Sequence, residues 1–488
     1  MIPLNASNIA RANIAKTGSV HAEHPMTAPL LPPFDPWLWF QACQQTWLAT
    51  LDPLGAGRQM RDQRLRHLLA FATRESPLYA ARAHGAKALA DVDPISKQLL
   101  MQHFDNWATD RRITLSGAEA AVASADGCAD PWLAHYMVWT SSGTSGHPGI
   151  FIQDAASLAA FDAIDALRLR GASLSQPGLG TWGLGRRFAF VGAIGGHYAG
   201  HVSMERLRRL VPAPWAPEIH LISVLEPLQQ IAERLQRLQP DVLITYPSCA
   251  TALAAWQREG TPGLRLEELW LGGEQLSSTQ RELLTTAYGC KLRNSYGASE
   301  FYSMAFECAQ GRLHLNDDWV ILEGIDAQGR AVPVGEFSHS TLLTNLANQV
   351  QPLLRYELTD RIRFVPEPCP CGCAFPVIEV QGRSDDVLVL PARQGGTVTL
   401  LPLVLETVME EEAGVTQFQL LYHQDGAMEL RLTAENGDND PSNSFDRCSR
   451  VLKAFFASQG VGHQRIVHGE QPPLRQRGSG KLRRVVML

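Results

Sequence analysis

The segment VWTSSGTSGHPG, residues Val138 to Gly149, joins hydroxyl side chains and glycines directly after an apolar stretch. Glycine allows tight turns and a close approach of the backbone, and hydroxyl and backbone N–H groups can bind phosphate oxygens. The segment is not a P-loop, because no Gly-Lys-Ser/Thr follows at the required spacing. Taken alone, it is equally consistent with a plain connection between two elements. It therefore predicts a phosphate-binding loop only where other parts of the chain support that function.

Five further segments with charged, aromatic or glycine residues follow it in the chain. Each alone could be an ordinary turn, whereas all of them together and in this order are improbable by chance. They are GGEQL (Gly272–Leu276), SYGASE (Ser295–Glu300), YELTDRIRF (Tyr356–Phe364), QGRSDD (Gln381–Asp386) and GSGKLRR (Gly478–Arg484).

Helix and strand patterns around these segments predict an α/β fold. Apolar residues recur at helical spacing from Trp37 to Ala83, which indicates an N-terminal helical cap. Helices and apolar strands then alternate, as in an α/β sheet. Strands are expected at Phe188–Val191, Val242–Thr245, Glu268–Leu271, Ile321–Ile325 and Ser340–Thr344. A smaller α+β unit is expected to follow, with helices at Leu401–Glu412 and Ser444–Gln459 and strands at Val387–Leu390, Gln417–Tyr422 and Met428–Ala434.

In the order of its motifs the chain resembles the adenylate-forming superfamily, and specifically the phenylacetate-CoA ligase branch. The resemblance covers most of the chain and includes LYAARA (Leu78–Ala83) and PISKQLL (Pro94–Leu100). It implies an acid–thiol ligase that uses ATP to activate a small, aromatic carboxylic acid as its acyl-adenylate. The acyl group would then pass to a thiol, either of CoA or of the phosphopantetheine of an acyl or aryl carrier protein.

Two other functions are compatible with the same resemblance. One is an acyltransferase of this fold that moves an aryl group between CoA and a carrier protein without ATP. The other is a nucleotide-binding relative with a regulatory or scaffolding role. The segment LVLPARQGGTVTLLPLVLE, after the hinge motif, differs from the short glycine turn and Asn-Val-Phe-Pro that the family typically has there. The resemblance therefore leaves the acyl acceptor open.

The resemblance also assigns roles to individual residues. Lys481 would reach the carboxylate and the α-phosphate, Glu300 would hold Mg²⁺ on the phosphates, and Asp385 would be the hinge. These residue types suit the reaction, because attack of a carboxylate on phosphorus brings anions together and needs positive charge to offset them. Thr144, in the phosphate loop, joins Lys481 and Glu300 in the predicted catalytic set. The predicted nucleotide-binding set is Ser141, Ser142, Gly143, Thr144, Ser145, Gly146, Gly272, Gly273, Glu274, Ser295, Tyr296, Gly297, Asp360 and Arg383.

Two segments lie where this family builds its acyl pocket, VGAIGGHYAGH (Val191–His201) and TYPSCA (Thr245–Ala250). A histidine and tyrosines suit a compact aromatic acid with a polar substituent, for which stacking and one hydrogen bond give discrimination. The alternative is that these side chains only pack the sheet. The predicted lining residues are His197, Tyr198, Tyr246 and Ser248.

A second group of residues suggests a metal site. PCPCGCAFP carries three cysteines, and FECAQGRLHL carries a cysteine and a histidine. Thiolate and imidazole ligands suit a closed tetrahedral Zn²⁺ site, which would be structural because it leaves no open position. This arrangement resembles that of the phenylacetate-CoA ligase branch, which has a cysteine and a histidine after the glutamate motif and a Cys-x-Cys-Gly before the hinge. The predicted ligands are Cys308, His314, Cys369 and Cys371, with Cys373 as a substitute for the histidine; the alternative is a set of reduced thiols without metal.

Three domains follow from these patterns. Residues 1–35 are expected to be a loose extension, residues 36–383 a large adenylate-forming domain with its helical cap at 36–90, and residues 384–488 a small mobile domain. The site would lie between the last two, and a homodimer is left open.

Composition limits the function further. The chain has 488 residues, 45% of them hydrophobic, and a formal net charge of -6, so it lacks the basic field of a nucleic-acid binder. No apolar run approaches the roughly 20 residues of a membrane span, and the first 30 or so residues lack the apolar core of a secretory signal. The nine irregularly spaced cysteines suit reduced thiols. A soluble, cytoplasmic enzyme is expected.

Overall fold

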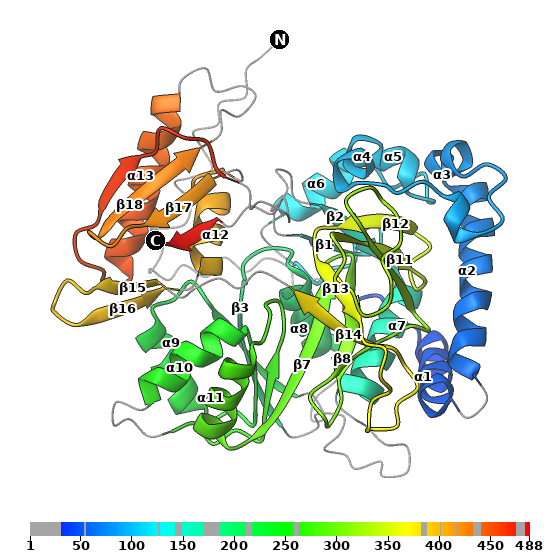
Figure 1. Cartoon of the computed structure of the whole chain (residues 1–488), viewed down its shortest axis with the longest axis horizontal. Helices are drawn as coiled ribbons and strands as arrows, with labels where there is room; N and C mark the ends of the chain where they lie inside the picture. The colour runs from blue at the N-terminus through cyan, green and yellow to red at the C-terminus, as the bar shows by residue number, and fades with distance from the viewer. Residues whose placement is uncertain are drawn as a thin grey trace, which may run out of the picture. The chain divides into compact units, whose positions relative to one another are not determined.

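The computed structural model describes residues 31–488 except 53–54, 125–126, 142–148, 170–185, 211–216, 258–262, 382–387, 401, 416–417, 433–440 and 475–483. The fold is mixed α/β, as predicted (Figure 1). None of the helices in this part of the chain combines the length and the apolar character needed to cross a bilayer.

The N-terminal part is helical, and side-chain caps set its helix boundaries. Asp35 begins α1 (Pro36–Leu51) by accepting from the N–H groups of Trp37 and Leu38, and Ser76 and Ser96 cap α3 and α4 in the same way. The other elements of this cap are α2 (Ala56–Glu75), α3 (Pro77–Arg82), η1 (Leu89–Asp91), α4 (Lys97–Gln102), α5 (Phe104–Trp107) and α6 (Leu115–Ala123).

A nine-stranded sheet forms the centre of the fold, in the order β13-β14-β9-β8-β7-β6-β5-β3-β4. The strands from β4 to β7 run parallel, and those from β7 to β13 run antiparallel. The strands are β3 (Arg187–Gly192), β4 (Glu218–Ser223), β5 (Val242–Thr245), β6 (Glu268–Leu271), β7 (Lys291–Ala298), β8 (Phe301–Glu307), β9 (Leu313–Leu315), β13 (Arg361–Phe364) and β14 (Val377–Gln381).

Helices cover the parallel half of this sheet. The helices α9 (Leu228–Leu238), α10 (Pro247–Gln257) and α11 (Ser278–Tyr288) lie together on one side of the strands in Figure 1. Their apolar residues share a buried cluster with Leu243 and Leu269. The helix α8 (Ala199–Leu210) packs instead against β3 and β4, and its Met204 joins Phe188, Phe190 and Trp270 in a separate cluster. Side chains of β3, β5 and β6 therefore belong to two different apolar clusters.

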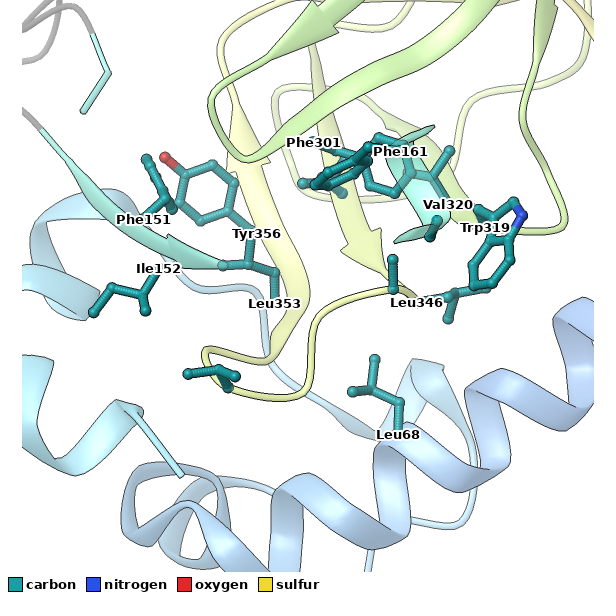
Figure 2. Packing of buried hydrophobic residues seen from close by; sticks show 14 of the residues in the cluster. Leu68, Phe151, Ile152, Phe161, Phe301, Trp319, Val320, Leu346, Leu353 and Tyr356 are labelled. Atoms are coloured by element: carbon teal, nitrogen blue, oxygen red, sulfur yellow. The ribbon is translucent and has the colours of Figure 1, made fainter. Parts of the chain in front are cut away.

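The remaining core joins the helical cap to two small sheets. A hairpin of β1 (Met137–Thr140) and β2 (Ile150–Gln153) precedes α7 (Ala155–Ile164), which continues into the π-helical turn η2 (Asp165–Leu169). The strands β10 (Val320–Ile325), β11 (Ser340–Asn345) and β12 (Leu353–Leu358) form an antiparallel sheet. Figure 2 shows side chains of α2, β2, α7, β8, β10 and β12 meeting in one core, with Phe161 edge-on to Phe301 at a centroid distance of 5.0 Å.

The elements after residue 387 form two sheets of their own. A hairpin pairs β15 (Leu388–Pro391) with β16 (Thr397–Leu400), and a four-stranded sheet has the order β19-β18-β17-β20. Its elements are α12 (Pro402–Glu411), β17 (Phe418–Tyr422), β18 (Ala427–Leu432), α13 (Pro441–Ser458), β19 (Arg465–His468) and β20 (Val485–Met487). The eight strands expected from the sequence, five in the body and three in this unit, are present in the described residues, as are the two helices expected for this unit. The hinge segment lies outside the described residues, so the division into domains stays a prediction.

A buried ion pair ties α1 to η2 and to the turn before β10. Nη1 of Arg168 lies 2.7 Å from Oδ1 of Asp318, and neither side chain is exposed to solvent. The guanidinium also donates to the carbonyl oxygen of Thr46 and to the hydroxyl of Thr50. Because every charge-bearing atom faces a partner, removal of one partner would leave the other charge buried and uncompensated.

We therefore predict that Asp318→Asn lowers the free energy of unfolding by about 3–5 kcal/mol, the scale for breaking a buried pair. Urea denaturation followed by circular dichroism measures it. The matched control is Asp326→Asn, whose partner Arg330 is largely exposed, and which should leave the transition unchanged. A wild-type transition in Asp318→Asn would contradict the importance of the pair.

Candidate active site

Residues of five of the six predicted motifs line one cleft of about 1990 Å³. The sixth motif, GSGKLRR, lies outside the described residues except for Arg484. The cleft opens at the carboxyl ends of β3, β5, β6 and β7, where open α/β sheets bind ligands. The predicted residues that line it are Ser141, Tyr198, Tyr246, Gly272, Gly273, Glu274, Ser295, Tyr296, Gly297, Glu300 and Asp360. Segments more than two hundred residues apart in the chain thus share a single site.

The neck of the hydroxyl and glycine loop is fixed directly on SYGASE. Nε1 of Trp139 donates to the carbonyl oxygen of Ser299 at 2.8 Å, and the Ser299 hydroxyl donates to the carbonyl oxygen of Thr140 at 3.2 Å. The neck is closed by the N–H of Ser141, which donates to the carbonyl oxygen of Gly149 at 2.9 Å. The tip, with the predicted residues Ser142, Gly143, Thr144, Ser145 and Gly146, lies outside the described residues.

Tyr296 and Asp360 form a pair across the cleft. The Tyr296 hydroxyl donates to Oδ2 of Asp360 at 3.1 Å. Burial, together with the charge of Asp360, raises the pKa of Tyr296 well above its usual range. The phenol therefore stays protonated and keeps the carboxylate oriented at the turn between β12 and β13.

Glu300 is buried at the base of the cleft, with 7% of its surface exposed. Burial raises the pKa of its carboxyl, and the hydroxyl of Tyr356 and the charge of Lys97 oppose that rise. The Tyr356 hydroxyl donates to Oε1 at 2.6 Å, and Nδ2 of Asn345 donates to the backbone carbonyl of Glu300. One carboxylate oxygen is thus engaged by Tyr356, and the motif glutamate is held in a defined orientation. Sequence analysis identified Glu300 but not Tyr356, although the tyrosine begins the motif YELTD.

Tyr356 owes its position to an irregularity in β12. The pairing of β11 with β12 shifts register between Leu343 and Asn345, and Arg355 adopts a left-handed backbone conformation at φ 51°. Such bulges redirect a strand's side chains and are common near active sites. Nε of Arg355 is held by Glu323 at 3.2 Å.

Lys97 is a functional candidate that sequence analysis missed. The segment PISKQLL adds to β12, because the N–H of Ile95 donates to the carbonyl oxygen of Arg355 and the N–H of Glu357 donates back to that of Ile95. This pairing places Nζ of Lys97 in the cleft, 3.4 Å from the hydroxyl of Ser141. A cation therefore lies at the neck of the predicted phosphate loop.

Asn294, directly before SYGASE, was also missed. It is 8% exposed and lines the cleft, and its Oδ1 has no hydrogen-bond partner among the described residues. A buried acceptor without a partner is costly, so this oxygen is suited to a ligand N–H group. The signal available in the sequence was the position of the asparagine at the head of the motif.

Two glycines of the motifs cannot be replaced without a clash. Gly273 has φ +78°, and a Cβ atom there would lie 2.9 Å from the ring of Tyr246. At Gly297 a Cβ atom would lie 1.9 Å from the carbonyl oxygen of Tyr302. The turn after β6 thus depends on glycine for its conformation and for close packing, and β7 within SYGASE depends on glycine for close packing.

Three other predicted site residues, Glu274, Ser248 and His197, make hydrogen bonds that hold neighbouring parts of the chain. The Glu274 carboxylate accepts from the backbone N–H and the hydroxyl of Ser248, at 2.9 and 2.8 Å, and so holds the start of α10. His197 is buried, with Nδ1 3.0 Å from the carbonyl oxygen of Val138. Neither Ser248 nor His197 is among the side chains that line the cleft. Arg383, Asp385 and Lys481 lie outside the described residues.

The four predicted metal ligands come together in one cluster. The ligand atoms of Cys308, His314, Cys369 and Cys371 all lie within 4.8 Å of one another. Cys308 lies in the turn after β8, His314 in β9, and the other two cysteines in the turn before β14, which pairs with β9. Since His314 faces the cysteines, the substitute Cys373 is not required.

The geometry of the cluster suits zinc. Zn–S bonds of about 2.3 Å in a tetrahedron require sulfur atoms about 3.8 Å apart, and Sγ of Cys308 lies 3.8 Å from Sγ of Cys369. Nε2 of His314 lies 3.3 Å from Sγ of Cys371, while Nδ1 lies 2.9 Å from the carbonyl oxygen of Phe375. That carbonyl fixes the ring so that Nε2 is left for a metal.

We predict that the purified protein contains about one zinc per chain and that Cys371→Ser loses it, because three ligands hold the ion more weakly. Metal analysis by mass spectrometry and the thermal midpoint measure the two effects. Cys290→Ser, at a half-buried cysteine outside the cluster, is the control and should keep the metal. Wild-type protein that folds normally without metal would contradict this prediction.

Comparisons with known proteins show what the fold is similar to. No family model matches the chain. Protein CapK of Staphylococcus aureus is 23% identical over 248 residues, which cover 50% of this chain and 53% of CapK. The matched region therefore spans about half of that relative's length.

Solved structures of 2-hydroxyisobutyryl-CoA ligase are similar over most of both chains. The structure with 2-HIB-AMP and CoA in the thioesterification state has a TM-score of 0.54, 20% identity, and coverage of 90% of this chain and 91% of the ligase. The post-adenylation structure with R3-HIB-AMP has a TM-score of 0.51 and 18% identity at the same coverage. At these identities the likeness establishes the fold.

Proposed function

We propose, since the chain has the fold of the adenylate-forming enzymes, that it uses ATP to convert a carboxylic acid into its acyl-adenylate and then into a thioester. One observation carries the proposal: the loop neck at Ser141, the Tyr296–Asp360 pair and the buried Glu300 share one cleft. The similar ligase structures hold an acyl-AMP, and one of them also holds CoA.

The first step joins two anions, and the residues of the cleft suit it. A carboxylate oxygen of the acid attacks the α-phosphorus of ATP, the P–O bond to the β-phosphate breaks, and pyrophosphate leaves. Lys97 and, in the closed enzyme, Lys481 would offset the charge on the phosphoryl oxygens. Glu300 would hold the Mg²⁺ ion, which supplies further positive charge at the phosphates.

The nucleotide would be positioned by the other residues of the cleft. Tyr296 offers an aromatic face for the adenine, and the unpartnered Oδ1 of Asn294 could accept from the adenine amino group. Asp360 could accept from the ribose hydroxyls while the Tyr296 hydroxyl holds it in place. These roles need only hydrogen-bond acceptors and one ring, which are the groups present.

In the second step a thiol sulfur attacks the acyl carbon, the bond from that carbon to the AMP oxygen breaks, and AMP leaves. The thiol belongs to CoA or to the phosphopantetheine of a carrier protein. We also propose a compact aromatic acid as substrate, a structural zinc at the cysteine cluster, and the cytoplasm as the site of action. None of the nine cysteines, all of which the structure describes, forms a disulfide, which suits a reducing compartment.

Exchange of labelled pyrophosphate into ATP tests the proposal. Benzoic, hydroxybenzoic, aminobenzoic, phenylacetic and cinnamic acids would be assayed with and without CoA. The expected result is acid-dependent exchange without thiol. Acyl transfer from an acyl-CoA to a carrier protein, with no exchange for any acid, would instead indicate an ATP-independent acyltransferase.

Lys481→Ala should lower the exchange rate at least about a hundredfold, the scale of removing one preorganised charge donor from a transition state. The measurement is the exchange rate at saturating acid and ATP. Lys453→Ala, at an exposed position of α13, is the control. A loss within assay error for Lys481→Ala would show that the catalytic lysine is misassigned.

Lys97→Met should lower kcat/KM for ATP about ten- to hundredfold, since a charge-assisted hydrogen bond contributes about 1.5–3 kcal/mol. Lys97→Arg, which keeps the charge, should recover part of the loss. Initial-rate kinetics with varied ATP measure the effect. An unchanged kcat/KM in Lys97→Met would show that this cation does not act on the nucleotide.

A further inference from the structure

The helix α1 and the residues just before it expose large apolar side chains to solvent. This short segment holds six of the twelve large apolar side chains that are exposed among the described residues. Single apolar side chains on a surface are normal, whereas a concentration of them marks an interaction site. The six are Leu31 (74% exposed), Phe34 (43%), Trp37 (64%), Phe40 (54%), Leu48 (38%) and Leu51 (57%).

The two faces of α1 differ in character. Its buried residues are the small Ala42, Thr46 and Ala49, and the helix packs on α2 and α7. The side chains of the opposite face fall within an arc of about 80° at 3.6 residues per turn. This face, the α1 stripe, consists of Trp37, Phe40, Gln44, Leu48 and Leu51, all of them exposed.

The α1 stripe has the same spacing in both directions from its centre. Trp37 and Leu51 each lie seven residues from Gln44, and Phe40 and Leu48 each lie four residues from it. Two copies packed antiparallel about a two-fold axis at Gln44 would therefore match along the whole stripe. Trp37 would face Leu51 of the second copy, and Phe40 would face Leu48. Such self-complementarity is what a two-fold symmetric interface requires.

The residue at the centre of the stripe suits contact with its own counterpart. An amide side chain carries both donors and an acceptor, so Gln44 can exchange two hydrogen bonds with Gln44 of a second copy. A single polar residue in an apolar helix seam fixes the register of the two helices. The apolar layer of a lipid bilayer, in contrast, offers an amide no partner.

The distribution of charge also favours a second copy. Between Asp35 and Asp52 the chain has no charged residue. Helices that lie on anionic membranes carry Lys and Arg on their polar face, whereas α1 has a carboxylate at each end instead. Because an uncharged stripe meets an identical stripe without repulsion, it suits self-association better than binding to a lipid surface or to a strongly charged protein.

The area of the exposed segment fits a small dimer interface. A whole aromatic side chain accounts for about 150–250 Å², so the six side chains together expose on the order of 600 Å², the upper end for the largest apolar patch of a monomer. Two copies would bury on the order of 1,200 Å², the lower end for specific interfaces. The rings of Trp37 and Phe40 are already stacked, with centroids 6.0 Å apart, which reduces the entropy lost on contact.

We propose that the α1 stripe is the contact of a symmetric homodimer, in which α1 packs antiparallel on α1 of a second copy about a two-fold axis at Gln44. The proposal concerns assembly and does not depend on the proposed chemistry of the cleft.

Sedimentation equilibrium of the full chain tests the proposal. Between about 1 and 100 μM, where small interfaces begin to associate, the wild type should reach twice the mass of one chain. Gln44→Glu and Gln44→Lys each place two like charges across the axis and should raise the dissociation constant of the dimer at least about a hundredfold. Because Gln44 is exposed, both variants should keep the wild-type fold, which circular dichroism checks.

A mixture of the two variants tests the symmetry. Equal amounts of Gln44→Glu and Gln44→Lys should associate again, because opposite charges then meet at the axis. Only an interface that brings the two copies of Gln44 together behaves in this way. The matched control is Gln230→Glu, at an exposed glutamine of α9, which should dimerise as the wild type does.

Each other outcome contradicts the proposal. A wild type that stays monomeric over this range would overturn it, and a dimer that persists in both Gln44 variants would place the interface elsewhere. Monomeric variants that fail to associate when mixed would overturn the two-fold axis at Gln44. Two further measurements identify another occupant: flotation of monomeric wild type with phosphatidylcholine and phosphatidylserine vesicles would indicate a lipid surface, and dimerisation only after removal of residues 1–30 would indicate that this segment covers the stripe.

Discussion

The site depends on one buried carboxylate. Glu300 is almost completely enclosed, and burial alone would favour its neutral form. The hydroxyl of Tyr356 and the charge of Lys97 counteract burial, and both arrive through β12, because the segment around Ile95 pairs with that strand. A bulged strand with Arg355 in a left-handed conformation thus sets both groups that act on Glu300. The left-handed conformation of Arg355 costs free energy, and such strained residues are found where they orient functional groups.

Sequence reasoning was sufficient for the fold and for the motif residues that the structure describes in the cleft, whereas Thr144, Arg383 and Lys481 lie outside the described residues. The hydroxyl and glycine segment, GGEQL and SYGASE are each local, with turn chemistry visible in the letters, and they converge on the cleft. The cluster of three cysteines and a histidine was also predictable, because few residue types bind metal and the spacing within each segment is short. What joined them in space was the pairing of β9 with β14, which no local pattern reveals.

The residues that were missed share a physical reason. Lys97, Tyr356 and Asn294 are ordinary in their local sequence. Lys97 and Tyr356 gain their importance from long-range contacts, and Asn294 gains it from its buried position in the cleft. His197 illustrates the converse, since its placement in a glycine-rich segment suggested a pocket residue. Its Nδ1 instead lies against the carbonyl oxygen of Val138, and its own carbonyl accepts from the N–H of Thr140. There it supports the strand that leads into the predicted phosphate loop.

Arg168 contacts three parts of the molecule: α1, Asn316 and Phe375. Its guanidinium lies 4.3 Å from the centre of the Phe375 ring, and the carbonyl oxygen of Phe375 contacts Nδ1 of His314 in the predicted metal site. Through Asn316 the same guanidinium holds the backbone of Ser303 in β8. The charge is fully buried beside Asp318, so it cannot shift to solvent without a large cost. The helical cap, β8 and the cysteine and histidine cluster are therefore held together by one buried guanidinium, and none of the three can shift without disturbing its ion pair with Asp318.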